Sequence, residues 1–148
     1  MAKTKPWTID QKEDDSSTIY CFGDTNEILA YTLGWFTWEK LKYDNNSSYD
    51  GSLKYMSSCS SPDGKIYLIG GVLISNNFPS STMYEVASWW IGKNIKKKNM
   101  LSKWFGHSCI FLNGYIYVIG GFSHKDVPNE APVTQATCEK FAVHENKW

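Results

Sequence analysis

The sequence contains no arginine: all fifteen of its basic residues are lysine, and fifteen Asp and Glu residues balance them. The missing guanidinium is the side chain best suited to bidentate recognition of carboxylates and phosphates. A net charge of zero also disfavours nucleic-acid binding by phosphate neutralisation and attachment to a membrane through a polybasic segment. We therefore expect neither nucleic acid nor membrane as a partner.

Long apolar runs are also missing. The polar start of the chain lacks the apolar stretch of a secretory signal, and no later run is long enough to cross a bilayer. The four cysteines include no Cys-x-x-Cys pair of the kind that suggests zinc or redox chemistry. These absences predict a cytoplasmic protein with reduced thiols, no metal site and no cofactor.

The chain does contain an internal repeat and a high aromatic content of 16%, which favours β structure. Segments 58–71 and 108–121 are identical at eight positions with a constant offset of fifty. Both contain a turn dipeptide, Asp63-Gly64 or Asn113-Gly114, that suits a two-residue hairpin turn. A short apolar strand and a Gly-Gly pair follow each turn. The repeat therefore predicts antiparallel hairpins.

Two further features extend the repeat. Ile19–Asp24 matches Ile66–Gly71 at an offset of forty-seven, with Asp24 in place of the second glycine. An aromatic residue is followed seven residues later by tryptophan in two places, Tyr31 to Trp38 and Phe141 to Trp148. The middle copy lacks this tryptophan.

With its Gly-Gly pairs, spaced tryptophans and Gly106-His107-Ser108 segment, the sequence resembles the kelch repeat, whose unit forms one four-stranded blade of a β-propeller. The resemblance implies an all-β fold of about three four-stranded antiparallel blades in an incomplete ring. We expect a degenerate first blade over 1–50, a second over 51–100 and an incomplete third over 101–148. The expected strands are 7–9, 19–22, 28–33 and 35–41, then 55–59, 66–69, 82–87 and 94–98, then 107–111, 115–119, 138–143 and one near 148.

Residues able to carry chemistry are assigned structural roles. Cys59 and Cys109 occupy the same place in the repeat, so we expect them to lie a blade-width apart and to form neither a disulfide nor a metal site. The resemblance implies that His107 is a structural, hydrogen-bonding histidine. The run Lys96–Lys98 is interpreted as a solvated edge. No catalytic residue is expected.

The loops after the Gly-Gly pairs differ in length and sequence although their flanks repeat, as recognition loops on a rigid scaffold do. The hypothesis is a non-enzymatic protein-interaction module that binds a protein partner through these loops. The candidate partner-binding residues at the loop tips are Asn76, Asn77, Phe78, His124, Lys125 and Asp126.

Other interpretations stay open. The chain could be part of a propeller enzyme that resembles copper oxidases or sugar isomerases, or a fragment or truncated product. Three blades would expose two apolar lateral faces, so two copies could instead pair as a homodimer that closes a six-blade ring.

Overall fold

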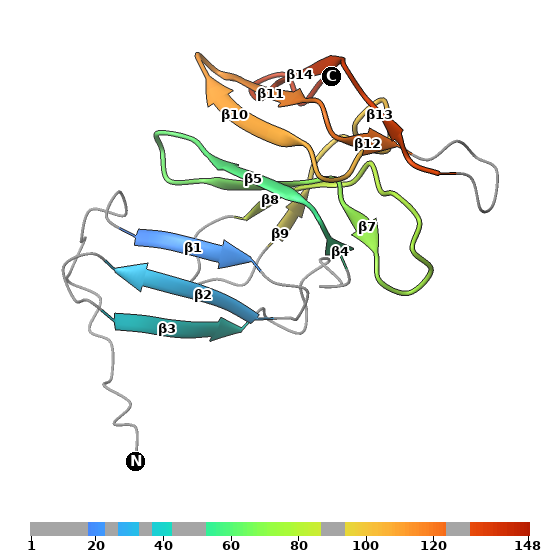
Figure 1. Cartoon of the computed structure of the whole chain (residues 1–148). Helices are drawn as coiled ribbons and strands as arrows, with labels where there is room; N and C mark the ends of the chain where they lie inside the picture. Colours follow the sequence, from blue (N-terminus) through green and yellow to red (C-terminus); the bar gives the residue numbers. More distant parts are fainter. Residues whose placement is uncertain (1–17, 23–26, 33–36, 43–52, 87–93, 124–130) are drawn as a thin grey trace.

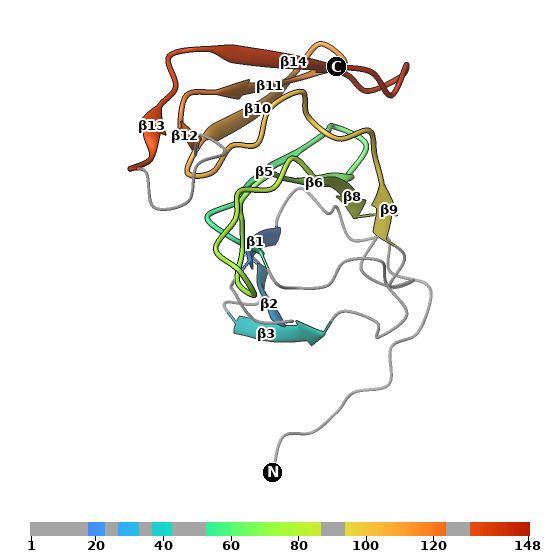
Figure 2. The same ribbon diagram turned by 90° about the vertical axis from the view of Figure 1, so that its right-hand side faces the viewer.

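The computed structural model describes residues 18–22, 27–32, 37–42, 53–86, 94–123 and 131–148, which form antiparallel sheets and contain no helix. Figures 1 and 2 show three main sheets in sequence order, with the second between the first and the third. The all-β prediction is confirmed. The strand expected at 7–9 lies outside the described residues.

Each main sheet is a meander in which neighbouring strands pair. The first sheet has the order β1-β2-β3, the second β5-β6-β8-β9, and the third β10-β11-β14. The bounds of the strands in the first sheet are β1 Thr18–Phe22, β2 Glu27–Thr32 and β3 Thr37–Lys42. Those in the second are β5 Ser57–Ser60, β6 Ile66–Ile69, β8 Met83–Val86 and β9 Asn94–Lys96. Those in the third are β10 Ser108–Leu112, β11 Tyr115–Ile119 and β14 Cys138–Ala142.

Two short ribbons were not predicted. β4 (Leu53–Lys54) pairs with β7 (Val72–Leu73), and β12 (Phe122–Ser123) pairs with β13 (Val133–Thr134). One strand of each ribbon, β7 or β12, begins directly after a Gly-Gly pair, where the sequence suggested only a loop.

The main core lies between the second and third sheets. Tyr67, Ile69 and Met83 of the second sheet pack in one cluster with Ile116, Val118 and Phe141 of the third, and with Met100 and Trp104 from the connection. The opposite face of the second sheet, on the side of the first, is also apolar and buried, with Leu68 almost inaccessible. Because both faces of β6 are covered, its sequence is apolar throughout.

The two predicted hairpin turns differ from each other. Asn113 and Gly114 both have positive φ, 51° and 82°, and join Leu112 directly to Tyr115 in the expected two-residue turn. In the second sheet the loop has three residues, Pro62, Asp63 and Gly64, closed by hydrogen bonds from Ser61 N–H to Lys65 O and from Gly64 N–H to Ser61 O. The two-residue prediction was wrong there, because Pro62 and Asp63 suit a type I turn followed by a left-handed glycine.

This extra loop residue shifts the register of the first hairpin strand by one position. Lys54 pairs with Val72 in one copy, whereas Phe105 pairs with Phe122 in the next. Equivalent residues of the second and third sheets are therefore fifty-one positions apart in the sequence before the turn and fifty positions apart after it. A shift of one residue turns a side chain to the opposite face of a sheet.

Cys59 and Cys109 are consequently not equivalent. Cys59 lies opposite Tyr67 and faces the third sheet, whereas Cys109 lies opposite Val118 and faces the second. The expectation that the two thiols lie a blade-width apart was wrong: they approach each other between the sheets.

The spaced aromatic pairs are in contact. The ring centroids of Tyr31 and Trp38 are 5.0 Å apart with an interplanar angle of 43°, and those of Phe141 and Trp148 are 5.0 Å apart at 47°. Such tilted pairs stabilise neighbouring strands beyond their buried area. A bridge between Ala142 and Lys147 holds the second pair in place.

The lysine run 96–98 is not uniformly solvated. Lys97 Nζ lies 2.7 Å from Glu85 Oε2, and the two side chains are only 18% and 7% exposed. The interpretation of this run as a solvated edge was therefore wrong for Lys97.

Both end sheets expose an apolar face. In the first sheet Ala30 is buried, and the opposite face, turned away from the second sheet, is exposed. The exposed apolar side chains of the end faces are Ile19, Leu29 and Trp38 in the first sheet and Ile110, Leu112 and Ile119 in the third. These are the faces that stacked neighbours cover in a closed propeller.

Candidate functional site

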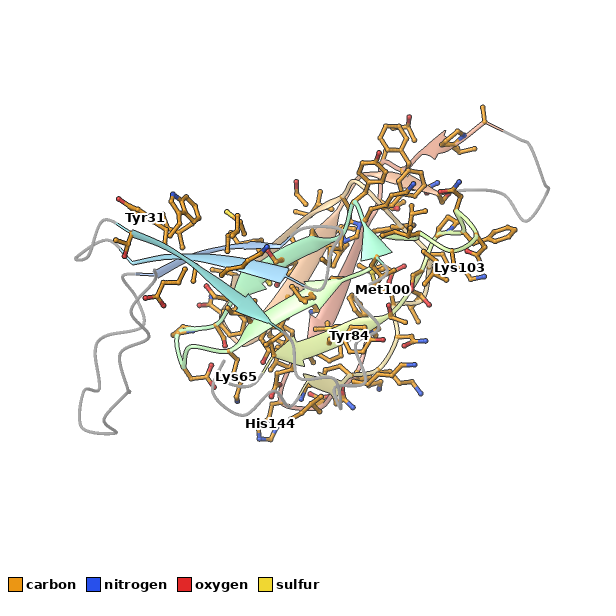
Figure 3. All side chains as sticks on the ribbon, turned by 90° about the horizontal axis from the view of Figure 1, so that it is seen from below. Tyr31, Lys65, Tyr84, Met100, Lys103 and His144 are labelled. Atoms are coloured by element: carbon orange, nitrogen blue, oxygen red, sulfur yellow. The ribbon has the colours of Figure 1, made fainter. Side chains whose placement is uncertain are left out.

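The Gly-Gly pairs lead the chain into the two ribbons. Gly70, Gly71, Gly120 and Gly121 all have positive φ, which side chains with a Cβ adopt only with strain. The ribbons lie together at one end of the sheets, opposite the tips of the hairpins (Figure 1). Figure 3 shows the same two ends of the molecule, with Lys103 at the ribbon end and Lys65 at the hairpin end.

The first ribbon continues into a compact, hydrogen-bonded turn. Leu73 N–H donates to Phe78 O at 2.9 Å, Asn77 N–H donates to Leu73 O at 2.8 Å, and Phe78 N–H donates to Asn76 Oδ1 at 3.0 Å. Asn77 has a φ of 58°, a conformation that asparagine tolerates well. The turn therefore holds Phe78, 56% exposed, in a fixed position.

Tyr55 is the most unusual residue at this end of the molecule. Its φ is 57°, in the left-handed region, and its side chain is 64% exposed. The structurally equivalent residue of the third sheet, at an offset of fifty-one, is Gly106, with a φ of 60°. A bulky residue held in this conformation stores strain, and such strain concentrates at functional positions.

The second ribbon lies directly beside Tyr55. Gly106 N–H donates to Tyr55 O at 2.9 Å, and a Cβ added to Gly106 would lie 3.5 Å from the Phe122 ring. The ring of Phe122 in turn lies 5.8 Å from that of Phe105. The exposed apolar residues of the ribbon end, hereafter the ribbon surface, are Tyr55, Ile74, Phe78, Phe122 and Val133.

The structure describes only some of the residues predicted to bind a partner. Asn76, Asn77 and Phe78 are exposed at the tip of the first ribbon. His124, Lys125 and Asp126 lie outside the described residues. Tyr55 was missed because it was expected to begin a strand. Its alignment with Gly106 at an offset of fifty-one was the available signal.

His107 lies beneath the first Gly-Gly pair. Its ring is buried, and a Cβ on Gly70 would lie 2.6 Å from His107 Cε1. Burial lowers the pKa of His107 to about 4, and the nearby Ile69 carbonyl opposes this only in part. The ring nitrogens do not reach hydrogen-bond geometry with any group. The residue is packed as expected, but the hydrogen bond implied by the resemblance is not formed.

Among the described residues, no three His, Cys, Asp or Glu side chains gather in a group that could hold a metal ion. The same part of the chain includes no helix suited to crossing a membrane.

Comparison with known proteins agrees with this architecture. The family model of the kelch motif matches residues 103–148, which include the third sheet and the approach to it. The chain is a kelch-repeat protein. An F-box/kelch-repeat protein of Arabidopsis thaliana is 30% identical to it, over 74% of this chain and 28% of the relative. The chain thus spans about a quarter of the length of that relative. Kelch repeats form β-propeller blades, so the three main sheets are antiparallel propeller blades in an incomplete ring.

Proposed function

We propose that this kelch-repeat protein is a non-enzymatic interaction module that binds a partner protein through the ribbon surface. Kelch repeats are generally protein-interaction modules, and this general role is the basis of the proposal. The observation that supports the finer proposal is Tyr55, an exposed tyrosine kept in a strained conformation at the same end of the molecule as the exposed rings of Phe78 and Phe122. We further propose that the protein acts in the cytoplasm.

The chemistry of the ribbon surface indicates the kind of partner. Aromatic side chains dominate the binding energy of protein interfaces because they bury large areas at low entropic cost. Lys54 lies with its Nζ 5.7 Å from the centroid of the Tyr55 ring and adds a positive charge at the rim. A partner segment with apolar residues flanked by an acidic group would complement this surface.

The double variant Tyr55→Ala/Phe78→Ala is expected to bind the partner at least about tenfold more weakly, because it removes the two most exposed rings of the ribbon surface. The partner is first captured in cells with a photo-reactive phenylalanine analogue at position 78 and identified by mass spectrometry. Its affinity for the purified chain is then measured by calorimetry.

The matched control is Leu101→Ala, which removes an apolar side chain that is 77% exposed outside the ribbon surface. This variant should bind within about twofold of the unmodified chain. Equal affinities for the double variant and the unmodified chain would show that the partner binds elsewhere.

We also propose that two copies pair head to tail and cover their apolar end faces. The end face of the first sheet in one copy would meet that of the third sheet in the other, so that two contacts close a six-blade ring. Each contact would bury large apolar side chains such as Trp38 against Ile110 and its neighbours. The ribbon surface stays free in this arrangement because it lies at the ends of the strands and not on the sheet faces.

Light scattering should therefore give about twice the chain mass of 16.9 kDa. The double variant Ile110→Lys/Leu112→Lys places charges on the end face of the third sheet. Each of the two contacts in the pair contains this face from one copy, so both contacts should be lost and the single-chain mass should be measured. Leu101→Lys, a change outside the end faces, should retain the doubled mass. A monomeric unmodified chain would rule out the pairing.

A further inference from the structure

Two cysteines from different sheets meet at the closest approach between the second and third sheets. Several Cα–Cα distances between β5 and β10 are within 8 Å, whereas the planes of stacked sheets are usually about 10 Å apart. Three small side chains lie in this gap: Ser57 and Cys59 from β5, and Cys109 from β10. The side chains of Cys59 and Cys109 interact directly across this gap, as formation of a bond between the two sulfur atoms requires.

The two thiols are free and partly buried, and they pack against the same core cluster. The other two cysteines of the chain, Cys21 and Cys138, are exposed. Cys21 lies on β1 of the first sheet, and Cys138 lies opposite Ile119 on the outer face of the third. Cys59 is therefore the thiol placed to react with Cys109.

The surroundings give the two thiols different reactivities. The neighbouring Cys59 side chain, with a smaller contribution from Ser57, holds the pKa of Cys109 below its ordinary value, although burial opposes this. The interaction with Cys109, together with burial, raises the pKa of Cys59. Cys109 is thus the thiol that more readily becomes a thiolate, the nucleophilic form.

We propose that Cys59 and Cys109 form a reversible disulfide between the second and third sheets when the protein meets a two-electron oxidant such as hydrogen peroxide. The Cys109 thiolate attacks one peroxide oxygen, the O–O bond breaks, and a sulfenic acid and hydroxide form. The Cys59 sulfur then attacks Cys109 Sγ. The S–S bond forms, the S–O bond breaks, and the leaving hydroxide takes the Cys59 proton as water.

In total, two thiols and one peroxide give one disulfide and two waters. The thiols lose two electrons and the peroxide gains them. A dithiol reductant reverses the reaction by thiol–disulfide exchange and is itself oxidised to a disulfide.

The disulfide would join residues that are fifty positions apart in the sequence. A cross-link of this span restricts the unfolded chain, and for a protein of this size we expect the melting temperature to rise by about 10 °C. The reduced protein should return to its original melting temperature.

The test uses the full chain with Cys21→Ser and Cys138→Ser, which retains only the proposed pair. The protein is treated with one equivalent of hydrogen peroxide, its remaining thiols are blocked with N-ethylmaleimide, and it is digested with trypsin. The expected product is peptide 55–65 linked to peptide 104–125, lost again after treatment with dithiothreitol. Two separately blocked peptides after oxidation would overturn the proposal.

Single variants test the order of the two steps. With Cys59→Ser, peroxide should leave a sulfenic acid on Cys109 that reacts with dimedone. With Cys109→Ser, Cys59 should react with dimedone at least about tenfold more slowly, because its thiolate is scarce. Equal labelling of the two variants would contradict the assignment of Cys109 as the first thiol to react. Circular dichroism of the untreated variants checks that both fold.

Discussion

Gly70→Ala is expected to lower the free energy of unfolding by at least about 3 kcal/mol, whereas Gly120→Ala should lower it by about 1–2 kcal/mol. The two glycines end equivalent strands, β6 and β11, and have similar φ values of 61° and 68°. Both substitutions therefore carry the same cost for a Cβ in the left-handed region. The difference between the two losses of unfolding free energy therefore measures only the steric clash of the added Cβ with neighbouring atoms.

The steric part is large at Gly70. A Cβ there would lie 2.6 Å from Trp104 O and 2.6 Å from His107 Cε1, and neither group can move freely because both residues are buried in the core. At Gly120 the nearest atom would be Gln135 O at 3.7 Å, an ordinary contact. Alanine at position 70 must therefore push the third sheet away from the second.

Urea unfolding followed by tryptophan fluorescence gives both free energies. The midpoint of Gly70→Ala should fall well below that of Gly120→Ala, or the variant should already be unfolded without urea. Equal losses of stability in the two variants would show that the close packing between Gly70 and the connection to the third sheet is absent.

Short sequence motifs were sufficient to predict most of the third sheet. Asn113-Gly114 favours a two-residue turn with positive φ at both positions, and the structure has that turn. Asp63-Gly64 carries the same local signal, yet the preceding Pro62 favours a type I turn and a three-residue loop. One loop residue changes the register, and the register decides which face of the sheet Cys59 occupies. The meeting of Cys59 and Cys109 was therefore hidden by the apparent match at an offset of fifty.

The candidate site could be predicted from the sequence only in part, because contacts between distant segments form much of it. Phe78 was found because it lies in a variable segment after a Gly-Gly pair. The two-residue strands of the ribbons are too short to show an alternating pattern, and they form only because a partner segment lies beside them. The backbone carbonyl of Tyr55, the residue with the strained conformation, accepts a hydrogen bond from Gly106, which lies in the connection to the next sheet. No pattern within residues 53–60 reveals that contact.

Lys97→Met is expected to lower the free energy of unfolding by about 2–3 kcal/mol, whereas Lys98→Met should change it by less than about 0.5 kcal/mol. The two lysines are adjacent and the substitution is the same, but their surroundings differ. Lys97 pairs with the buried Glu85 at 2.7 Å, while the side chain of Lys98 is exposed. Removing Lys97 leaves a carboxylate without its partner among the apolar side chains of the core.

The double variant Glu85→Gln/Lys97→Met distinguishes an unpaired charge from lost packing. Glutamine has nearly the shape of glutamate without its charge, so the double variant should regain at least half of the stability lost in Lys97→Met. If instead the packing of the Lys97 stem provides the stability, the double variant will be no more stable than Lys97→Met. Thermal melts of the unmodified chain and the four variants Lys97→Met, Lys98→Met, Glu85→Gln and Glu85→Gln/Lys97→Met at the same pH provide the comparison. Because the pair joins β8 to the residue after β9, its loss should free the outer strand of the second sheet first.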